Sequence, residues 1–170
     1  MSSVGRLAAL AVLAVDRLSQ LSTAELEDHL SADYLDETSG HAVPYGSVFD
    51  EAAQAFLLRH FVEVVLLGVS NEALEAHLSA CMGRPVAVVG NEPLLEACPC
   101  CGFLTLSQLG QYDICPVCNW EDDGIGAHDQ SRYSAPNRAS LQDFRLRVRD
   151  RIDSRGRWYR RVRMPDGRRD

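Results

Sequence analysis

Residues 98–124 read CPCCGFLTLSQLGQYDICPVCNWEDDG and contain five of the six cysteines of the 170-residue chain. Clustered thiols bind metals, carry out redox chemistry or form disulfides. A disulfide framework fits poorly, because the five cysteines lie within 21 positions and only Cys81 lies elsewhere. The stretch therefore predicts a metal or redox site in a reducing compartment, and we expect a cytoplasmic protein.

Four of these cysteines form two CxxC motifs, Cys98 with Cys101 and Cys115 with Cys118, separated by thirteen residues. A CxxC turn brings both thiolates to one side of a tight loop, and Gly102 lets the backbone bend close beneath the first pair. Two such turns supply four sulfur atoms at the corners of a tetrahedron, the geometry of structural Zn²⁺ with Zn–S distances of about 2.3 Å. The sequence therefore predicts that these four cysteines bind a structural zinc ion.

The competing interpretation is a thiol oxidoreductase that uses Cys98 with Cys100 or Cys101, because CPVC resembles the CPxC of glutaredoxin-like enzymes. Such an enzyme needs a CxxC at the N-terminus of a helix that follows a strand, and neither motif has that context. Four thiolates also leave no coordination position for a water molecule, so the zinc is expected to be structural and not catalytic. No nucleophile elbow, phosphate-binding glycine loop or metalloprotease motif occurs in the sequence. We therefore predict that the protein is not an enzyme.

The other two cysteines are expected to have different roles. Side chains of adjacent residues diverge, so Cys100 and Cys101 are not expected to bind one ion together. We predict that Cys100 is a small buried side chain near the metal, with a reactive thiol as the alternative. Cys81 is expected in the core. The connecting residues 103–114 alternate apolar and polar side chains and predict a small β-hairpin.

The blocks CPCCGFLTL, YDICPVC, WEDDG and PNRASL follow one another in this order. They resemble the bacterial cysteine-rich CPCC domain family, over about residues 97–152. The chain departs from that pattern at Asn119, where an aromatic residue is expected, and at Ser134 and Ala135, where glycines are expected. The resemblance implies a zinc-ribbon-like, zinc-binding module and no particular reaction.

Apolar periodicity and capping residues predict an α+β protein, in which an N-terminal helical bundle is followed by a small zinc-ribbon-like β-hairpin module and a C-terminal helix. We expect helices at residues 4–21, 22–32, 49–67 and 70–83, a loop at 36–47, a strand at 84–90 and a helix at 140–156. Helix N-termini are expected to be capped by Ser22 with Glu25, by Ser70 and by Ser140 with Asp143, and Gly83 is expected to end the fourth helix. The last helix is expected to carry one apolar stripe, formed by Leu141, Phe144, Val148 and Ile152. The helix at 49–67 shows a wide apolar face that includes Phe49 and Val64. The chain is divided into a helical domain (1–90), the zinc module with its helix (91–154) and an arginine-rich tail (155–170). The N-terminal half is predicted to be all-helical.

Two helical segments are similar to each other. Residues 22–32 read STAELEDHLSA and residues 70–80 read SNEALEAHLSA, with seven of eleven positions identical. Duplication of a helical hairpin and convergence of two capped helices both explain this similarity. His29 and His77 occupy matched positions, and we expect matched packing and not a metal site.

The first residues raise the question of targeting. Arg6 precedes an apolar run at residues 7–15, as in a signal peptide, but the run continues into a patterned helix without a small-residue cleavage site. We therefore expect a buried or amphipathic helix. No apolar stretch reaches the 18 or so residues that a membrane span needs, so no membrane contact is predicted.

Charge is strongly segregated along the chain. Residues 1–131 contain four arginines and 19 acids, for a net charge of −15, whereas residues 132–170 contain 13 arginines and five acids, for a net charge of +8. An acidic surface of this kind favours a basic protein partner. The acidic residues that we expect to contact such a partner are Glu25, Glu27, Asp28, Glu121, Asp122 and Asp123. For the acids after Trp120, the alternative is that they cap backbone amides or pair with arginines while Trp120 packs on the zinc lobe.

The arginine-rich tail has two interpretations. It could bind phosphates and stack on bases, and the residues for this nucleic-acid alternative are Arg157, Trp158, Tyr159, Arg160, Arg161 and Arg163. It could instead fold onto the acidic body of the same chain, and an acidic body would repel a nucleic acid. We prefer the second interpretation.

These observations lead to three functional hypotheses. The first is a non-enzymatic, zinc-stabilised protein that acts by protein–protein interaction, such as an immunity protein that neutralises a cationic bacterial toxin through its acidic surface. The second is a nucleic-acid-binding regulator that uses the zinc module and the tail. The third is the thiol oxidoreductase.

Overall fold

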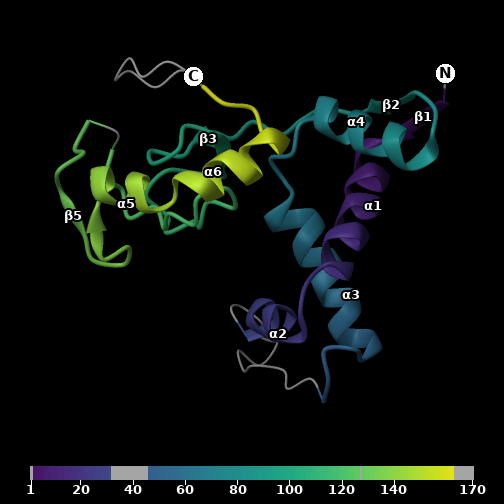
Figure 1. The fold of residues 1–170 in the computed structure, drawn as a ribbon, viewed down its shortest axis with the longest axis horizontal. Helices are drawn as coiled ribbons and strands as arrows, with labels where there is room; N and C mark the ends of the chain where they lie inside the picture. The colour runs from purple at the N-terminus through teal and green to yellow at the C-terminus, as the bar shows by residue number, and fades with distance from the viewer. Residues whose placement is uncertain (1, 32–45, 127, 163–170) are drawn as a thin grey trace.

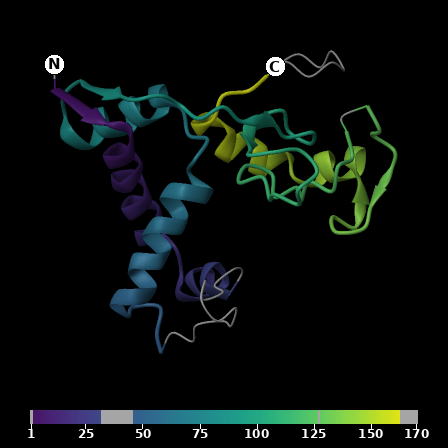
Figure 2. The same ribbon diagram turned by 180° about the vertical axis from the view of Figure 1, so that it is seen from behind.

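The computed structural model describes residues 2–31, 46–126 and 128–162. Figure 1 shows two lobes, a helical lobe formed by the N-terminal half and a smaller lobe that contains the cysteines. The C-terminal segment passes between them, and the reverse view in Figure 2 shows the same arrangement. The protein is thus a mixture of helices and small sheets, as the α+β prediction requires.

The helical lobe is built from four helices. These are α1 (Arg6–Ser19), α2 (Thr23–Ser31), α3 (Glu51–His60) and α4 (Asn71–Met82), and α3 continues into a π-helical turn at Phe61–Val65. All four lie within the predicted ranges. α1 and α3 run side by side, with α2 near one end of the pair and α4 near the other (Figure 1). The buried core of this lobe comprises Ala9, Leu10, Leu13, Ala14, Phe61, Val62, Leu66, Val69, Leu74, Leu78, Val86 and Val88.

The capping residues read from the sequence are confirmed. Ser22 and Glu25 form a capping box, since the Ser22 amide donates to the Glu25 carboxylate at 2.8 Å and the Glu25 amide donates to Ser22 Oγ at 3.3 Å. Ser70 Oγ accepts a hydrogen bond from the Ala73 amide at 3.1 Å. Gly83 ends α4 in the left-handed conformation, with φ of 62°.

The prediction that the N-terminal half is all-helical is wrong. β1 (Ser2–Gly5) pairs in parallel with β2 (Val86–Val89), in a register that joins Ser2 to Val86 and Gly5 to Val89. β2 lies inside the predicted strand, but β1 takes the start of the predicted first helix. α1 begins at Arg6, whose guanidinium donates to the carbonyl oxygens of Leu67 and Val69 at 2.8 and 2.7 Å. This contact anchors the start of α1 to the segment before α4.

The second lobe has short strands and short helices. β3 (Glu96–Ala97) pairs with β4 (Leu104–Leu106), and β5 (Tyr133–Ser134) pairs with β6 (Ala139–Ser140), both antiparallel. The predicted hairpin at 103–114 is therefore displaced: the observed hairpin encloses the first CxxC, and only its second strand lies in that range. The residues after β4 form turns, because the chain must return to place the second CxxC beside the first.

The predicted helix at 140–156 is broken in two. α5 (Leu141–Arg147) and α6 (Arg149–Arg155) meet at Val148, whose φ of −106° and ψ of 13° interrupt the helix, and a 3₁₀ turn (Gly156–Trp158) follows. Ser140 caps α5, as expected, by accepting from the Asp143 amide. The predicted apolar stripe does face the second core, which comprises Cys98, Cys100, Cys101, Phe103, Leu106, Cys115, Val117, Cys118, Trp120, Ile125, Leu141 and Val148.

Residues 158–162, which we call the strap, connect the two lobes. On the helical side, the Ser70 amide donates to the Trp158 carbonyl at 2.9 Å, and Tyr159 Oη donates to the Val65 carbonyl at 2.9 Å. On the other side, the Leu104 amide donates to the Arg160 carbonyl at 2.9 Å. The strap therefore supplies backbone hydrogen bonds to both lobes.

Some side chains lie differently from their predicted positions. Cys81 is exposed and not in the core. Phe49 and Val64, which were predicted on the buried face of the central helix, have exposed fractions of 70% and 59%. The predicted loop at 36–47 falls mostly outside the described residues, as does the end of the tail. In the described parts of the chain, no helix has the length and apolar character needed to cross a membrane.

Candidate metal centre

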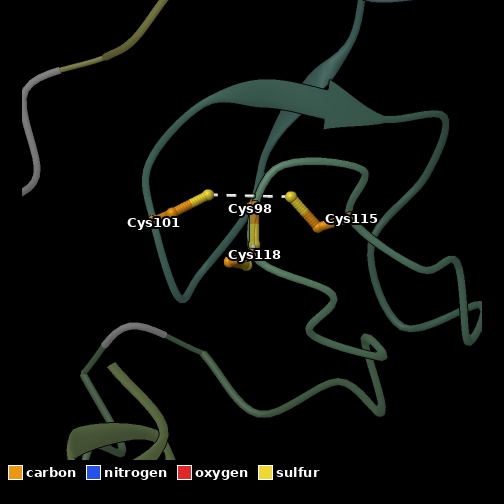
Figure 3. A group of neighbouring side chains, drawn as sticks. All are labelled: Cys98, Cys101, Cys115 and Cys118. Carbon is orange, nitrogen blue, oxygen red and sulfur yellow. Dashed lines mark hydrogen bonds between the residues drawn. The ribbon is translucent and has the colours of Figure 1, made fainter. Parts of the chain in front are cut away.

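The two CxxC turns bring their four sulfur atoms together. Figure 3 shows the side chains of Cys98, Cys101, Cys115 and Cys118 converging on one point between the turns. All four Sγ atoms lie within 4.8 Å of one another. Sγ of Cys98 is 3.7 Å from that of Cys118, and Sγ of Cys101 is 3.6 Å from that of Cys115. The four cysteines predicted as a ligand set are therefore assembled as one buried cluster.

The cluster has the dimensions of a zinc site. Four sulfurs placed tetrahedrally at about 2.3 Å from an ion are separated by about 3.8 Å. The shortest separations observed here, 3.6 and 3.7 Å, are close to that edge. Disulfide bonds would need sulfur atoms about 2.0 Å apart, and the described cysteines are all unpaired. Soft thiolates in this geometry fit a metal ion such as Zn²⁺.

The two turns have the same backbone hydrogen bonds. In the first, the Gly102 amide donates to the Cys98 carbonyl at 2.8 Å and the Cys98 amide donates to the Phe103 carbonyl at 2.9 Å. In the second, the Asn119 amide donates to the Cys115 carbonyl at 2.8 Å and the Cys115 amide donates to the Trp120 carbonyl at 2.9 Å. CPCCGF and CPVCNW are thus two copies of one knuckle, a repeat that the spacing of the cysteines alone does not reveal.

This equivalence explains the departure from the family pattern at Asn119. The residue after the second cysteine of each knuckle has a positive φ, which is 77° at Gly102 and 63° at Asn119. Glycine adopts this conformation without strain, and asparagine is among the few other residues that do so readily. Asn119 therefore preserves the turn that Gly102 makes in the first knuckle.

The equivalence also assigns a role to Cys100. Cys100 occupies the position that Val117 occupies in the second knuckle, and their exposed fractions are 3% and 0%. The cluster of possible metal ligands does not include it. The prediction that Cys100 is a small buried side chain beside the metal site is confirmed.

The electrostatic environment favours metal binding over redox exchange. Burial raises the pKa of the Cys98 thiol well above its usual value. Burial also acts to raise the pKa of the Cys115 thiol, but hydrogen bonds from the neighbouring thiols outweigh it and lower that pKa. Cys115 is nevertheless fully buried, whereas a redox-active CxxC needs an accessible thiol of lowered pKa. Thr105 Oγ1 lies 3.2 Å from Sγ of Cys115 and can donate a hydrogen bond to its thiolate. Each CxxC lies in a turn, and the residues that follow it are not helical. A divalent ion is the group that would stabilise four buried thiolates together.

The WEDDG segment serves the structure of this lobe. Trp120 is fully buried, and its ring meets that of Phe144 edge to face at 5.1 Å. Asp122 is only 1% exposed and accepts hydrogen bonds from the Gly110 amide at 2.7 Å and the Gly124 amide at 3.3 Å. The interpretation that the acids cap amides is therefore correct for Asp122. Its inclusion among the partner-contacting acids is wrong, because its carboxylate is enclosed.

The aromatic residues of the predicted nucleic-acid site are not free to stack on bases. The ring of Trp158 contacts His77 at 5.6 Å, and the Arg17 guanidinium lies over it at 4.5 Å. Burial raises the pKa of Tyr159 well above its ordinary value, and its hydroxyl is bound to the helical lobe. Both rings pack against the helical core. That part of the nucleic-acid prediction is wrong, because the two rings stabilise the chain's own lobes.

Some arginines of the tail contact other residues of the chain, and others are exposed to solvent. Arg160 forms an ion pair with Glu92 at 2.7 Å, as expected if the tail folds onto the acidic body. Arg157 is exposed, although its guanidinium lies 5.4 Å from the Trp158 ring centroid. Arg161 donates from Nε to the Cys101 carbonyl at 3.1 Å. Arg163 lies outside the described residues.

A family model described as cysteine-rich CPCC matches residues 96–168. The match supports the resemblance predicted from the sequence and covers the metal lobe, the strap and the tail. The helical lobe lies outside it. Searches of curated proteins and of solved structures gave no match. Residues 96–168 are therefore similar to the cysteine-rich CPCC family, and the four-cysteine cluster that they contain can hold a metal ion.

Proposed function

We propose that this chain is a zinc-stabilised binding protein without enzymatic activity, and that its helical lobe binds a basic protein partner. In this proposal the four-cysteine cluster holds a structural Zn²⁺ ion. The finer version of the proposal is an immunity protein that neutralises a cationic bacterial toxin in the cytoplasm. The observation that carries it is the coincidence of exposed acids and an apolar groove on the helical lobe.

The acids lie on one short helix. Glu25, Glu27 and Asp28 are all exposed on α2, and Glu51 lines the groove beside it. The groove has a volume of about 560 Å³ and runs between α1, α2 and the start of α3. Its apolar side chains are Val15, Leu18, Leu21, Leu26, Phe49, Ala55 and Leu58.

This combination favours a partner segment with both apolar and basic side chains. Apolar anchors would fill the groove, and arginines or lysines would face the acids around it. Opposite charges on the two proteins would accelerate their association, and an inhibitor of a toxin needs fast association. In the metal lobe, Glu121 and Asp123 are partly exposed and offer a second acidic edge.

The proposal can be tested with a basic protein that co-purifies with this chain from cell extract at low salt. Binding is measured by calorimetry at low salt and at about 0.3 M salt, where charge steering is largely screened. We expect Glu27→Lys combined with Glu51→Lys to weaken binding at least tenfold. Glu72→Lys, which changes an exposed acid on α4, serves as the matched control.

Two results would contradict the proposal. One is the absence of binding at low salt by the metal-loaded protein. The other is equal affinity in the double variant and the control, which would mean that the face formed by α1, α2 and α3 is not the contact surface. Rescue of bacterial growth on co-expression would support the immunity function in particular. Salt-sensitive binding to RNA or duplex DNA, with no protein partner, would favour the nucleic-acid alternative.

A further inference from the structure

Arginines from the C-terminal segment surround both knuckles of the metal centre. At the first knuckle, Arg145 donates from Nε to the Cys100 carbonyl and from Nη2 to the Pro99 carbonyl, both at 2.7 Å. Arg161 donates to the Cys101 carbonyl of the same knuckle at 3.1 Å. Three consecutive carbonyl groups of the CPCC turn therefore have an arginine partner.

The second knuckle is held in a similar way by residues of α6. Arg151 donates from Nη1 to the Cys118 carbonyl at 3.3 Å. Arg155 donates from Nη1 to the Pro116 carbonyl and to Asn119 Oδ1, both at 3.2 Å. The two knuckles thus share a pattern that goes beyond their own backbones, because each is bound by two arginines.

These contacts suit the chemistry of a tight metal-binding turn. Carbonyl groups in such a turn have few backbone partners, and a carbonyl that is buried without one is costly. A guanidinium has five N–H donors in a rigid fork, so one arginine can hold two neighbouring carbonyls. Arg145 does this with the carbonyls of Pro99 and Cys100.

The charge of the arginines also matches the site. Four thiolates around a divalent ion carry a net charge of −2, and burial makes such a charge expensive unless positive groups lie nearby. The chain as a whole is acidic, yet 13 of its 17 arginines lie in residues 132–170. Four of these arginines lie where an anionic centre needs compensation, namely Arg145, Arg151, Arg155 and Arg161.

We propose that Arg145, Arg151, Arg155 and Arg161 are positioning residues of the metal centre. They fix the conformation of both CxxC turns through the carbonyl groups and offset the negative charge of the metal-bound thiolates. Metal affinity therefore depends on the folded C-terminal segment, although the described residues of that segment supply no ligand to the cluster.

The test compares metal affinity among variants of the full chain. Loss of a supporting hydrogen bond around a metal site typically costs about 10- to 100-fold in metal affinity. Arg145→Gln frees two carbonyls that lie between the ligands Cys98 and Cys101, and we expect it to lower Zn²⁺ affinity by about tenfold or more. Arg145→Lys keeps the charge but loses the fork, so it should fall between Arg145→Gln and the unmodified chain. Zn²⁺ affinity is measured at pH 7 by competition with a chromophoric chelator. Arg149→Gln, which changes an exposed arginine in the same segment, is the matched control.

Two further readouts separate positioning from simple packing. Co²⁺ bound by the variant should show a weaker or shifted thiolate charge-transfer band, because the turns no longer hold the sulfurs in one geometry. The urea stability of the Zn²⁺-loaded protein is measured in parallel. If Arg145 only packs the lobe, Arg145→Gln will lower that stability and leave the Co²⁺ spectrum unchanged, and Arg145→Lys will be no better than Arg145→Gln. That result, or an equal loss of affinity in Arg149→Gln, would overturn the proposal.

A double variant tests whether the arginines of the second knuckle have the same role as Arg145 at the first. Arg151→Gln with Arg155→Gln changes only the contacts of the second knuckle, and we expect a loss of Zn²⁺ affinity at least as large as that of Arg145→Gln. Circular dichroism of the helical lobe shows whether each variant remains folded. Unchanged affinity in this double variant would contradict the assignment for the second knuckle.

Discussion

The helical lobe and the metal lobe are stabilised by different means. The helical lobe buries aliphatic side chains from α1, α4, the π-helical turn and β2, such as Leu13 and Leu74, in a core of ordinary type. In the metal lobe, strands are two or three residues long and the core is made largely of cysteines and aromatic rings. The comparison favours hydrophobic burial as the source of stability of the first lobe and, under the proposed function, metal binding as that of the second.

The largest effect should come from removing the metal. Structural Zn²⁺ contributes about 10–16 kcal/mol of binding free energy to zinc-dependent folds, so a chelator or Cys115→Ser should unfold the metal lobe. Each lobe contains one tryptophan, Trp120 in the metal core and Trp158 against the helical core. We expect the fluorescence of Trp120 to report exposure to water, while most of the helical circular dichroism persists.

A matched cysteine variant sharpens this test. Cys100→Val reproduces the residue of the second knuckle, Val117, and should keep full Zn²⁺ binding and near-normal stability. If chelation leaves Trp120 buried, or if Cys100→Val loses the metal as Cys115→Ser does, the contrast between the lobes is wrong.

A core substitution should act on the helical lobe alone. Leu13 is fully buried in α1, whereas Leu7 on the same helix is 70% exposed. Leu13→Ala should destabilise the helical lobe by about 2–5 kcal/mol, because it leaves a cavity in a packed core. Leu7→Ala should change stability by no more than about 0.5 kcal/mol. Urea unfolding followed by helical circular dichroism measures both, and Zn²⁺ affinity should be the same in both variants.

The sequence predicted those features that depend on local patterns. The spacing of Cys98, Cys101, Cys115 and Cys118 fixed the ligand set, because a CxxC turn is defined by its own residues. Ser70 and Gly83 marked the ends of α4 for the same reason. The knuckle repeat is local in the same way, in the alignment of CPCCGF with CPVCNW.

The missed features depend on contacts between distant residues. β1 pairs with a strand 84 positions away, and the Cys100 carbonyl meets Arg145 from 45 positions away. Hydrogen bonds to backbone groups leave no pattern in the sequence, because almost every residue carries the same backbone groups. Periodicity also shows which helix faces are apolar but not which are covered, and for this reason Phe49 was predicted as buried although it is exposed.

The interface between the lobes can be tested at Gly68. A Cβ atom at this position would lie 2.6 Å from the Leu104 carbonyl oxygen and 3.3 Å from the Tyr159 ring. Gly68→Ala therefore forces the helical lobe away from β4 and the strap, at a cost of about 1–3 kcal/mol. Gly5→Ala is the matched control, because a Cβ there meets nothing within 4 Å.

We expect Gly68→Ala to separate the unfolding transitions of the two lobes. Trp120→Phe and Trp158→Phe backgrounds allow each lobe to be followed by the remaining tryptophan, and the Zn²⁺-loaded protein is used throughout. Coincident transitions in Gly68→Ala, with midpoints equal to those of Gly5→Ala, would show that the contact through Leu104 does not couple the lobes.

The smallest effect concerns the pH dependence of the helical lobe. His29 is half-buried, with its ring 4.9 Å from that of Phe61 and 5.8 Å from that of His60. Burial lowers the pKa of His29, and this outweighs the opposite influence of Asp28 and Glu25. The folded state therefore binds a proton at His29 less readily than the unfolded state does.

The sign of the pH effect follows from this difference. The part of the helical lobe's stability that depends on neutral His29 is fully present above the unfolded pKa of histidine, about 6.5. It is lost as the pH falls through the lower pKa that His29 has in the folded state. We expect the urea midpoint of the helical lobe to be lower at pH 5.5 than at pH 7.5, and His29→Gln to reduce that difference. Because acid also releases metal from thiolates, chelator is present at both pH values and only the helical signal is followed. His128→Gln changes an exposed loop histidine and should leave the pH difference unaltered; an equal reduction in both variants would show that burial of His29 is not the cause.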